Sequence, residues 1–194
     1  LYSQSIYFPP TDGSKWETTS LLELNWDEEY IPELYDFLEE QNTKGFLVLN
    51  NGKIAIEAYF DNFTKDSLWY WASAGKSLTA ALVGIAQNKG YLSIDDKTSD
   101  YLGKGWTSLS QDKEDLIKIR HQLTMTTGLD DEVEDHYCTD PQCLKYKSDA
   151  GTRWAYHNGP YTLLRNVLEN ATEMDYNVLT HLELKSKIGL EGVW

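Results

Sequence analysis

The chain has 194 residues and a formal net charge of −14, and its residues are 41% hydrophobic and 13% aromatic. This length suits one domain of ordinary size or a large part of a bigger one. The apolar share is too high for a disordered chain. The acidic charge disfavours nucleic acid and anionic membranes as partners. No stretch approaches the roughly 18 consecutive apolar residues of a membrane helix, so we expect no membrane span.

The chain begins Leu-Tyr-Ser-Gln, without Met and without a basic and apolar leader. We therefore expect a processed form from which any signal peptide has been removed. Cys138 and Cys143 flank a short segment in which Pro141 suits a turn, so a small disulfide loop is expected. A disulfide indicates a periplasmic or secreted protein. Two reduced cysteines are the alternative, and a metal site with His136 is less favoured because further ligands at metal spacing are missing.

The first predicted elements are an irregular arm, a helix and a hairpin. Residues 1–30 are aromatic, polar and rich in turn residues, which is typical of an irregular arm. Residues 29–41 place apolar side chains at helical spacing. Residues 45–60 alternate apolar and polar side chains on either side of Asn51-Gly52, the strongest short hairpin signal. The chain is therefore predicted to open with a helix packed against an antiparallel sheet.

Helices dominate the rest of the chain. The predicted helices share apolar residues spaced three or four apart and span residues 73–89, 118–127 and 160–180, with a shorter helix after a turn at 91–96. Residues 130–152 are acidic and polar and contain both cysteines, so we expect a long surface loop. Strands and helices do not alternate as they do in dinucleotide-binding folds.

The segment Trp71-Ala-Ser73-Ala-Gly-Lys76 carries a chemical motif. A nucleophile elbow requires Gly in place of Trp71, and a phosphate-binding loop requires Gly in place of Tyr70. What remains is S-x-x-K, which places hydroxyl and amine side by side on a helix. A neutral amine can take the serine proton, but the pKa of a free lysine is about 10.4, so burial or nearby positive charge is needed. We expect Trp69, Tyr70 and Trp71 to form an apolar wall beside the amine.

A second S-x-x-K match occurs at Ser110-Gln-Asp-Lys113. It lies in a charged, polar stretch with no apolar helix behind it, which is typical of a solvated loop. Ser73, in contrast, precedes a long predicted helix whose N-terminal amides favour developing negative charge. The first match is therefore the candidate nucleophile.

Tyr156-His-Asn158 is the only Y-x-N segment of the chain. In an extended or turn segment, residues i and i+2 face the same way, so both side chains can point into one cleft. A phenol there can relay a proton between Ser73, Lys76 and a leaving group. The Asn158 amide can bind a substrate amide and help to hold Lys76. The alternative interpretation is a Tyr-Asn turn on the surface.

Taken together and in this order, these motifs resemble those of the serine β-lactamase, penicillin-binding protein and esterase family. The similarity is closest to its class C-like branch and, within that branch, to the 6-aminohexanoate-oligomer hydrolases. The segments that carry the resemblance are Ser73–Lys76, Ala81 to Asp96, Ile119 to Leu129, Gly151 to Asn158, and Lys187 to Trp194 with its Ile188-Gly189-Leu190 and terminal Trp.

The resemblance implies an α+β fold of β-lactamase/transpeptidase type, with an antiparallel sheet flanked by helices and a helical subdomain. It implies that Ser73 is the acylated nucleophile, Lys76 the base, Tyr156 the proton-relaying phenol and Asn158 a substrate-positioning amide. Substrates would be small-molecule or peptide-like amides, esters or β-lactams, hydrolysed through an acyl-enzyme. No cofactor and no metal are expected.

The family carries a third motif, Lys or His with Gly, on a later strand, and the chain ends before it. His157-Asn158-Gly159 spells H-x-G but overlaps the Y-x-N segment. We therefore expect residues 1–44 to form an arm and helix, and residues 45–194 a catalytic domain that lacks its C-terminal strands. Such a sheet would expose an open edge through which copies of the chain could associate.

Two other classes of function stay open at this point. The chain could be a catalytically silent binding module with the same fold, or a fragment that needs a separate C-terminal part. A zinc hydrolase is disfavoured because the four histidines lack metal-ligand spacing. The sequence does not separate amidase, esterase and β-lactamase activity, and the resemblance favours amide or ester hydrolysis.

Overall fold

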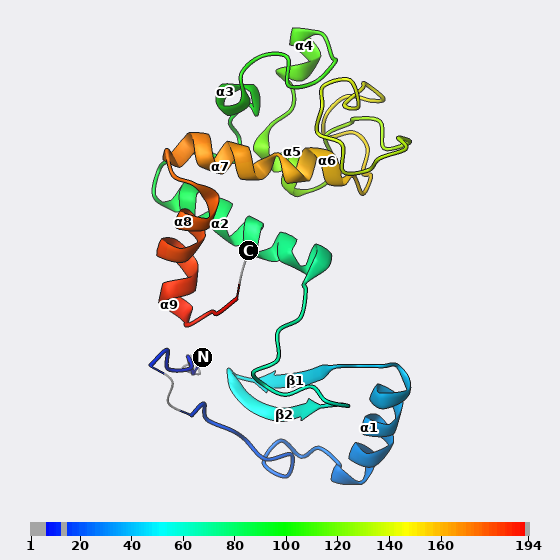
Figure 1. The fold of residues 1–194 in the computed structure, drawn as a ribbon, viewed down its shortest axis with the longest axis vertical. Helices are drawn as coiled ribbons and strands as arrows, with labels where there is room; N and C mark the ends of the chain where they lie inside the picture. The colour runs from blue at the N-terminus through cyan, green and yellow to red at the C-terminus, as the bar shows by residue number, and fades with distance from the viewer. Residues whose placement is uncertain (1–6, 13–14, 193–194) are drawn as a thin grey trace. The chain divides into compact units, whose positions relative to one another are not determined.

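The structure, a computed structural model, describes residues 7–12 and 15–192 (Figure 1). The chain divides into two compact units, Leu1–Tyr70 and Trp71–Trp194, which are described separately. The start of the predicted N-terminal arm and Trp194, the last residue of the family-like ending, lie outside the described residues.

The first unit contains the predicted hairpin. Strands β1 (Gly45–Asn50) and β2 (Lys53–Tyr59) pair antiparallel, with a register shift after Val48. Asn51 and Gly52 connect them with φ angles of 51° and 87°. Positive φ at both central residues is what a type I′ turn requires, and its twist matches that of the two strands. The hairpin prediction is therefore confirmed, including its turn.

The predicted helix of the first unit is confirmed as well. A 3₁₀ turn, η1 (Glu28–Tyr30), leads into α1 (Ile31–Glu40). The Asp27 carboxylate accepts a hydrogen bond from the backbone of Glu29 and so caps the turn. Only Leu38 of α1 is buried. This helix therefore covers little apolar surface within its unit.

One edge of the two-stranded sheet is partly covered by the N-terminal segment. The Thr19 amide donates to the carbonyl of Ile54 at 2.9 Å, and the Ile54 amide donates to the carbonyl of Glu17 at 3.0 Å. Within the described residues no other strand pairs with the outer edge of β1. Association of copies through that edge stays a prediction.

The second unit is helical. Its elements are η2 (Ala72–Gly75), α2 (Lys76–Asn88), α3 (Ser99–Leu102), α4 (Gln111–Glu114), α5 (Ile119–Leu123), α6 (Asn158–Thr162), α7 (Leu164–Thr172), α8 (Tyr176–Thr180), the π-helical turn η3 (His181–Lys185) and α9 (Ser186–Ile188). Two predicted helices are shorter than expected. The helix predicted over 118–127 ends at Leu123, and Met125 has a left-handed backbone. The helix predicted over 160–180 is broken by left-handed Glu173, and α8 restarts after the Asp175 cap.

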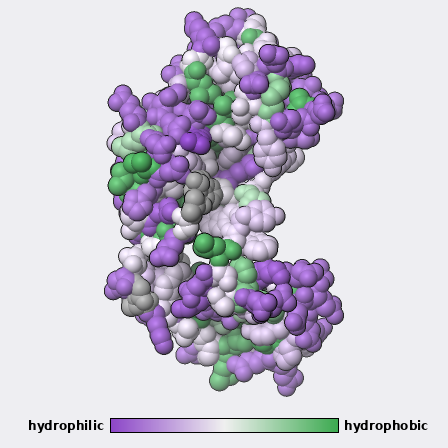
Figure 2. Space-filling view, viewed as in Figure 1, coloured by the Kyte–Doolittle hydropathy of each residue, from purple (hydrophilic) through white to green (hydrophobic). Residues whose placement is uncertain are grey.

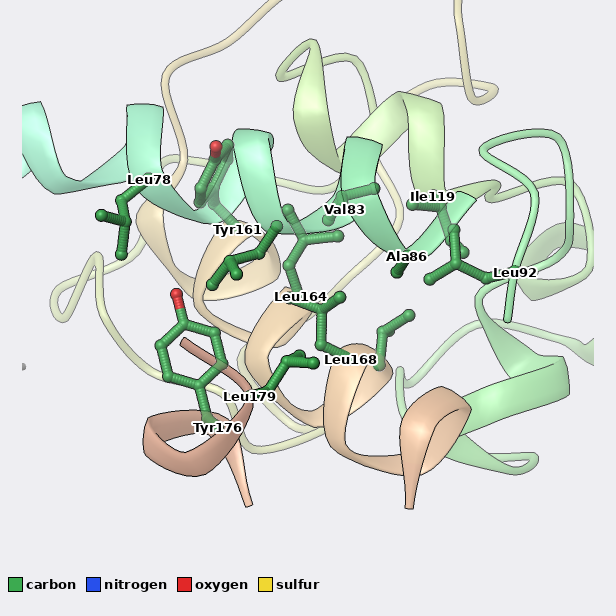
Figure 3. Packing of buried hydrophobic residues seen from close by; sticks show 12 residues of the cluster. Leu78, Val83, Ala86, Leu92, Ile119, Tyr161, Leu164, Leu168, Tyr176 and Leu179 are labelled. Carbon is green, nitrogen blue, oxygen red and sulfur yellow. The ribbon is translucent and has the colours of Figure 1, made fainter. Parts of the chain in front are cut away.

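The main hydrophobic core lies between α2, α5, α7 and α8 (Figure 3). Its buried residues are Leu78, Leu82, Val83, Ala86, Leu92, Ile119, Tyr161, Leu164, Val167, Leu168, Tyr176 and Leu179. Helices α2 and α7 run side by side and supply most of these side chains (Figure 1). Fully burying one leucine contributes about 1.5–3 kcal/mol, so this core anchors the unit.

A second, smaller core consists of Trp106, Ile117, Leu129 and Leu144. Leu144 lies within the segment predicted as a surface loop and is fully buried, so that prediction is wrong for this part of the loop. The disulfide expected between Cys138 and Cys143 is present. The loop is thus held by the disulfide that the sequence predicted and by one buried side chain, Leu144, whose burial the polar composition of the loop does not reveal.

Hydrophilic residues predominate on the visible face of each unit (Figure 2). This agrees with the net charge of −14. No helix among residues 7–12 and 15–192 is long and apolar enough to cross a membrane. In the same part of the chain, no group of three or more His, Cys, Asp or Glu side chains is arranged to hold a metal ion.

Candidate active site

Ser73 lies in a tight turn directly before α2. The turn η2 continues into α2, so Ser73 and Lys76 are one helical turn apart, as predicted. Ala72 has a φ of 45°, in the left-handed region that residues with a Cβ rarely adopt. Strain of this kind concentrates at functional sites, and here it sets the direction of the chain immediately before Ser73.

The Lys76 amine lies between two of the predicted site residues. Its Nζ donates to Ser73 Oγ at 3.0 Å and to Asn158 Oδ1 at 2.8 Å. Ser73 is exposed, Lys76 is half-buried and Asn158 is only 8% exposed. The structure thus brings together three residues that the sequence places up to 85 positions apart. An amine in contact with a hydroxyl can exchange a proton with it once the amine is neutral.

Tyr156 joins this group from the segment before α6. A hydrogen bond to Ser73, and a second one to Lys76, lower the pKa of the Tyr156 phenol, while burial opposes the change. The ring centroid lies 5.2 Å from Lys76 Nζ, within the range of a cation–π contact. With 46% of its surface exposed, Tyr156 is accessible to a ligand. All four predicted site residues therefore meet in one place.

Tyr161 is a neighbour of Lys76 that the sequence reasoning missed. Its hydroxyl donates to the Lys76 carbonyl at 2.8 Å, and its ring centroid lies 5.5 Å from Nζ. Burial raises the pKa of this phenol. The rings of Tyr156 and Tyr161 thus lie near the amine. Of the expected apolar wall, Trp69 and Tyr70 belong to the first unit, and Trp71, the first residue of the second unit, is 49% exposed. The sequence signal that could have identified Tyr161 is its position one helical turn after Asn158.

Gln122 supports the segment that carries Asn158. Its Nε2 donates to the carbonyl of Pro160 at 2.7 Å, and its Oε1 accepts from the Thr98 hydroxyl at 2.9 Å. Gln122 and Thr98 are buried. Buried polar groups are costly unless paired, so this network fixes the first turn of α6 relative to α5. The sequence signal for this buried network is a glutamine among apolar residues of a predicted helix.

The disulfide loop packs against the residue next to Asn158. The Gly159 amide donates to the His136 carbonyl at 2.9 Å. A Cβ at Gly159 would lie 2.3 Å from the Cys138 carbonyl oxygen, so no side chain fits there. His157 is 3% exposed, and within the described residues neither ring nitrogen has a hydrogen-bond partner. Burial lowers the pKa of its imidazole.

A cavity of about 310 Å³ opens beside Lys76. It is lined by Ala72, Gly75, Lys76, Thr79, Tyr161, Thr162, Arg165, Tyr176 and Asn177. The four residues from η2 and α2 occupy positions i, i+3, i+4 and i+7 and so form one stripe of this helical segment. The cavity therefore begins next to the serine–lysine pair and follows the helix.

The second S-x-x-K match has a different environment. Lys113 forms an ion pair with Asp149 and lies 5.4 Å from the centroid of the Tyr146 ring. Its amine is thus engaged by a carboxylate, in contrast to Lys76, which contacts a hydroxyl and an amide oxygen. This geometry agrees with the choice of Ser73 over Ser110.

Known proteins share this fold. The sequence model of the Beta-lactamase family matches residues 36–186. The chain therefore belongs to the β-lactamase family, which includes penicillin-binding proteins and related hydrolases. Its fold is the β-lactamase/transpeptidase-like α+β fold that the sequence indicated, with a small antiparallel sheet and helices. A search of curated proteins found no match.

Three solved structures illustrate the likeness. A candidate β-lactamase from Bacteroides dorei superimposes with a TM-score of 0.69 at 21% identity, over 84% of this chain and 52% of that one. A candidate 6-aminohexanoate-dimer hydrolase from Bacillus anthracis gives 0.67 at 14% identity, over 91% and 54%. The octameric penicillin-binding protein homologue from Pyrococcus abyssi gives 0.67 at 16%, over 84% and 43%. The chain thus spans about half of the length of the structures that it matches.

Proposed function

We propose that the protein is a serine hydrolase that acts on an amide or ester through a covalent acyl-enzyme. The observation that carries this proposal is the Lys76 amine, which contacts both Ser73 Oγ and Asn158 Oδ1. Membership of the β-lactamase family supports it. The disulfide supports a periplasmic or secreted location.

In the proposed reaction, Ser73 Oγ attacks the substrate carbonyl carbon, and its proton passes to the neutral Lys76 amine. Tyr156, which contacts both groups, relays that proton to the leaving amine or alcohol as the carbonyl–heteroatom bond breaks. Water then attacks the acyl-enzyme, returns a proton through the same groups and releases the acid. Asn158 holds Lys76 in place and binds the substrate amide.

The test is labelling with a neutral alkyl fluorophosphonate, followed by intact-mass measurement and peptide mapping. We expect one adduct, on Ser73, and none on a Ser73→Ala variant. Lys76→Met should label far more slowly and stay folded, because methionine is a good helix former. If the unmodified protein is labelled at Ser73, its turnover of esters, amides and β-lactams is then measured to identify the substrate class.

A chain that is folded but never labelled would contradict the proposal for this chain. It would favour the two alternatives, a silent binding module or a fragment that needs a C-terminal part. Labelling of a chain continued past Trp194 separates these two. A fragment gains reactivity at Ser73 when it is extended, and a silent module does not.

A further inference from the structure

The disulfide loop, residues 135–144, is a constraint close to the site that the proposed chemistry does not use. Cys138 and Cys143 are only five positions apart, and a series of tight turns folds the segment on itself. The stabilisation that a disulfide gives to a whole chain grows with the number of residues that it encloses. A link over so short a separation therefore acts mainly on the local shape of the loop and on what the loop contacts.

The loop caps the helix that begins at Asn158, and the two lie next to each other (Figure 1). The first amides of a helix have no partner within it. The N-cap residue of α6, His157, makes no side-chain cap, and the Gly159 amide donates instead to the His136 carbonyl of the loop at 2.9 Å. A Cβ at Gly159 would lie 2.3 Å from the Cys138 carbonyl oxygen, so the two backbones are in close contact. The start of α6 is therefore held by the backbone of the loop.

The buried ring of His157 favours an open loop. A Cβ at Gly159 would lie 3.5 Å from Nε2 of this ring and 2.3 Å from the Cys138 carbonyl oxygen, so the ring and the loop adjoin the same glycine. The ring is 3% exposed, and neither nitrogen has a hydrogen-bond partner among the residues that the structure describes. A buried polar group without a partner raises the free energy of the folded state. Opening the loop admits water to the ring and removes this cost, and the disulfide opposes that opening.

The segment around Asn158 is held on both sides without the loop. Before it, the Ala155 amide donates to the Met125 carbonyl at 3.0 Å. After it, the Pro160 carbonyl accepts from Gln122 Nε2 at 2.7 Å. Opening of the loop therefore releases only the short stretch between these two anchors, and the hydrophobic core of the unit stays packed.

We propose that the disulfide loop is a redox-sensitive positioning element of the site. With Cys138 and Cys143 linked, the loop caps α6 and keeps the Asn158 oxygen on the Lys76 amine, at 2.8 Å. With two free thiols, the loop opens, Lys76 loses this partner and Ser73 reacts slowly. The inference rests on the proposed function, since it concerns the reactivity of Ser73.

The redox step is an exchange with a dithiol. One thiolate of the dithiol attacks a sulfur of the disulfide, and the second resolves the mixed disulfide. Two electrons and two protons pass to the cysteines, and the dithiol becomes a cyclic disulfide. Both cysteines are partly exposed, so a small dithiol reaches them. Reducing compartments keep cysteines as thiols and oxidising compartments link them. The proposed hydrolase is therefore weakly reactive before export and becomes reactive after it.

The test measures how fast a neutral alkyl fluorophosphonate labels Ser73, in protein with the disulfide and in protein kept reduced by dithiothreitol. We expect the reduced protein to label about tenfold more slowly, the effect of one lost charge-assisted hydrogen bond. The chain contains only two cysteines, so dithiothreitol has no other disulfide to act on. The double variant Cys138→Ser, Cys143→Ser should label at the slow rate with or without the reductant.

Two further variants separate positioning from general stability. Asn158→Ala should label slowly with the disulfide intact, and reduction should slow it no further if the loop acts through Asn158. A second tenfold loss on reduction of this variant would reject the positioning role. Leu92→Ala is the matched control, because it weakens the main core whereas the loop packs on the smaller one. With its disulfide intact it should label at the wild-type rate, so that lower stability alone does not explain slow labelling.

Equal labelling of the oxidised and reduced protein would overturn the inference and leave the proposed hydrolase intact. If Ser73 is never labelled, hydrogen exchange decides the inference without reaction. The Gly159 amide should exchange faster after reduction, because it loses the His136 carbonyl, whereas the Val167 amide within α7 should not change. Unchanged exchange at Gly159 would reject the inference. An equal increase at Val167 would reject it too, because the link would then stabilise the whole unit.

Discussion

The two units differ in how much apolar surface they bury within themselves. In the first unit, Leu38 and Ile56 are the only buried hydrophobic residues that the structure describes. The second unit has two clusters with many fully buried side chains. A sheet of two strands is marginal by itself and needs a further strand or helix against its apolar face. The second unit therefore has a core of its own, and the first depends on what covers it.

The candidate site follows this division. Ser73, Lys76, Tyr156 and Asn158 all belong to the second unit, and its helices and loops position them. The serine–lysine pair rests on α2, whose opposite side is part of the main core. Within the second unit, the geometry of the site therefore depends on helix packing.

The largest predicted effect tests the contrast in burial directly. Leu164→Ala in the main core should lower the free energy of unfolding by about 2–5 kcal/mol, because it removes buried contacts and leaves a cavity. Leu49→Ala on β1, where the side chain is exposed, should cost less than about 0.5 kcal/mol. Urea denaturation measures both. Equal losses would show that the sheet is covered in solution and that the contrast is not real.

A smaller effect is predicted for the polar network that links the core to the site. Gln122→Leu leaves the Thr98 hydroxyl and the Pro160 carbonyl without a buried partner, at a cost of about 1–3 kcal/mol. The first turn of α6 should loosen, so Asn158 holds Lys76 less well and the labelling of Ser73 slows.

Thr98→Val is the matched control for this network. It removes only the bond between Thr98 and Gln122 and keeps the bond from Gln122 to Pro160, so it should lower stability with less change in labelling. If both variants slow labelling equally, Gln122 acts on stability alone and has no specific positioning role.

The smallest predicted effect concerns pH and His157. Burial holds the pKa of this imidazole below its ordinary value of 6.5. The nearby carboxylates of Asp131 and Asp130 raise this pKa and so oppose the effect, whereas His136 lowers it further. The unfolded chain therefore takes up this proton at a higher pH than the folded one. Stability is complete above about pH 6.5 and should decline as the pH falls below it. Denaturation at pH 7.5 and pH 5 measures the loss, which a His157→Gln variant should reduce.

The sequence predicted the parts of the structure that depend on local chemistry. The Asn51-Gly52 turn, the hairpin and the one-turn spacing of Ser73 and Lys76 follow from neighbouring residues, and the structure has them. The sequence did not predict that the helix expected over 160–180 is broken at Glu173, because a glutamate with a left-handed backbone has no strong sequence signal. The burial of Leu144 was also missed, since it depends on contacts with distant residues.

For the candidate site as well, the residues in short local motifs were predicted and those placed by long-range packing were not. Ser73, Lys76, Tyr156 and Asn158 belong to short motifs, and the resemblance to a family placed them in one site. Tyr161, Gln122 and Arg165 reach their positions only through the packing of α5, α6 and α7. Their roles depend on which helix faces which, and periodicity along one segment does not contain that information.

The contact between Gly159 and the disulfide loop has a consequence for sequence variation. A Cβ at position 159 would meet the Cys138 carbonyl at 2.3 Å, and the Gly159 amide donates to the His136 carbonyl. The loop and this glycine must therefore change together. In relatives that carry a larger residue at this position, we expect the segment between the counterparts of Asp130 and Leu144 to be shortened or rerouted, and the pair of cysteines to be lost with it.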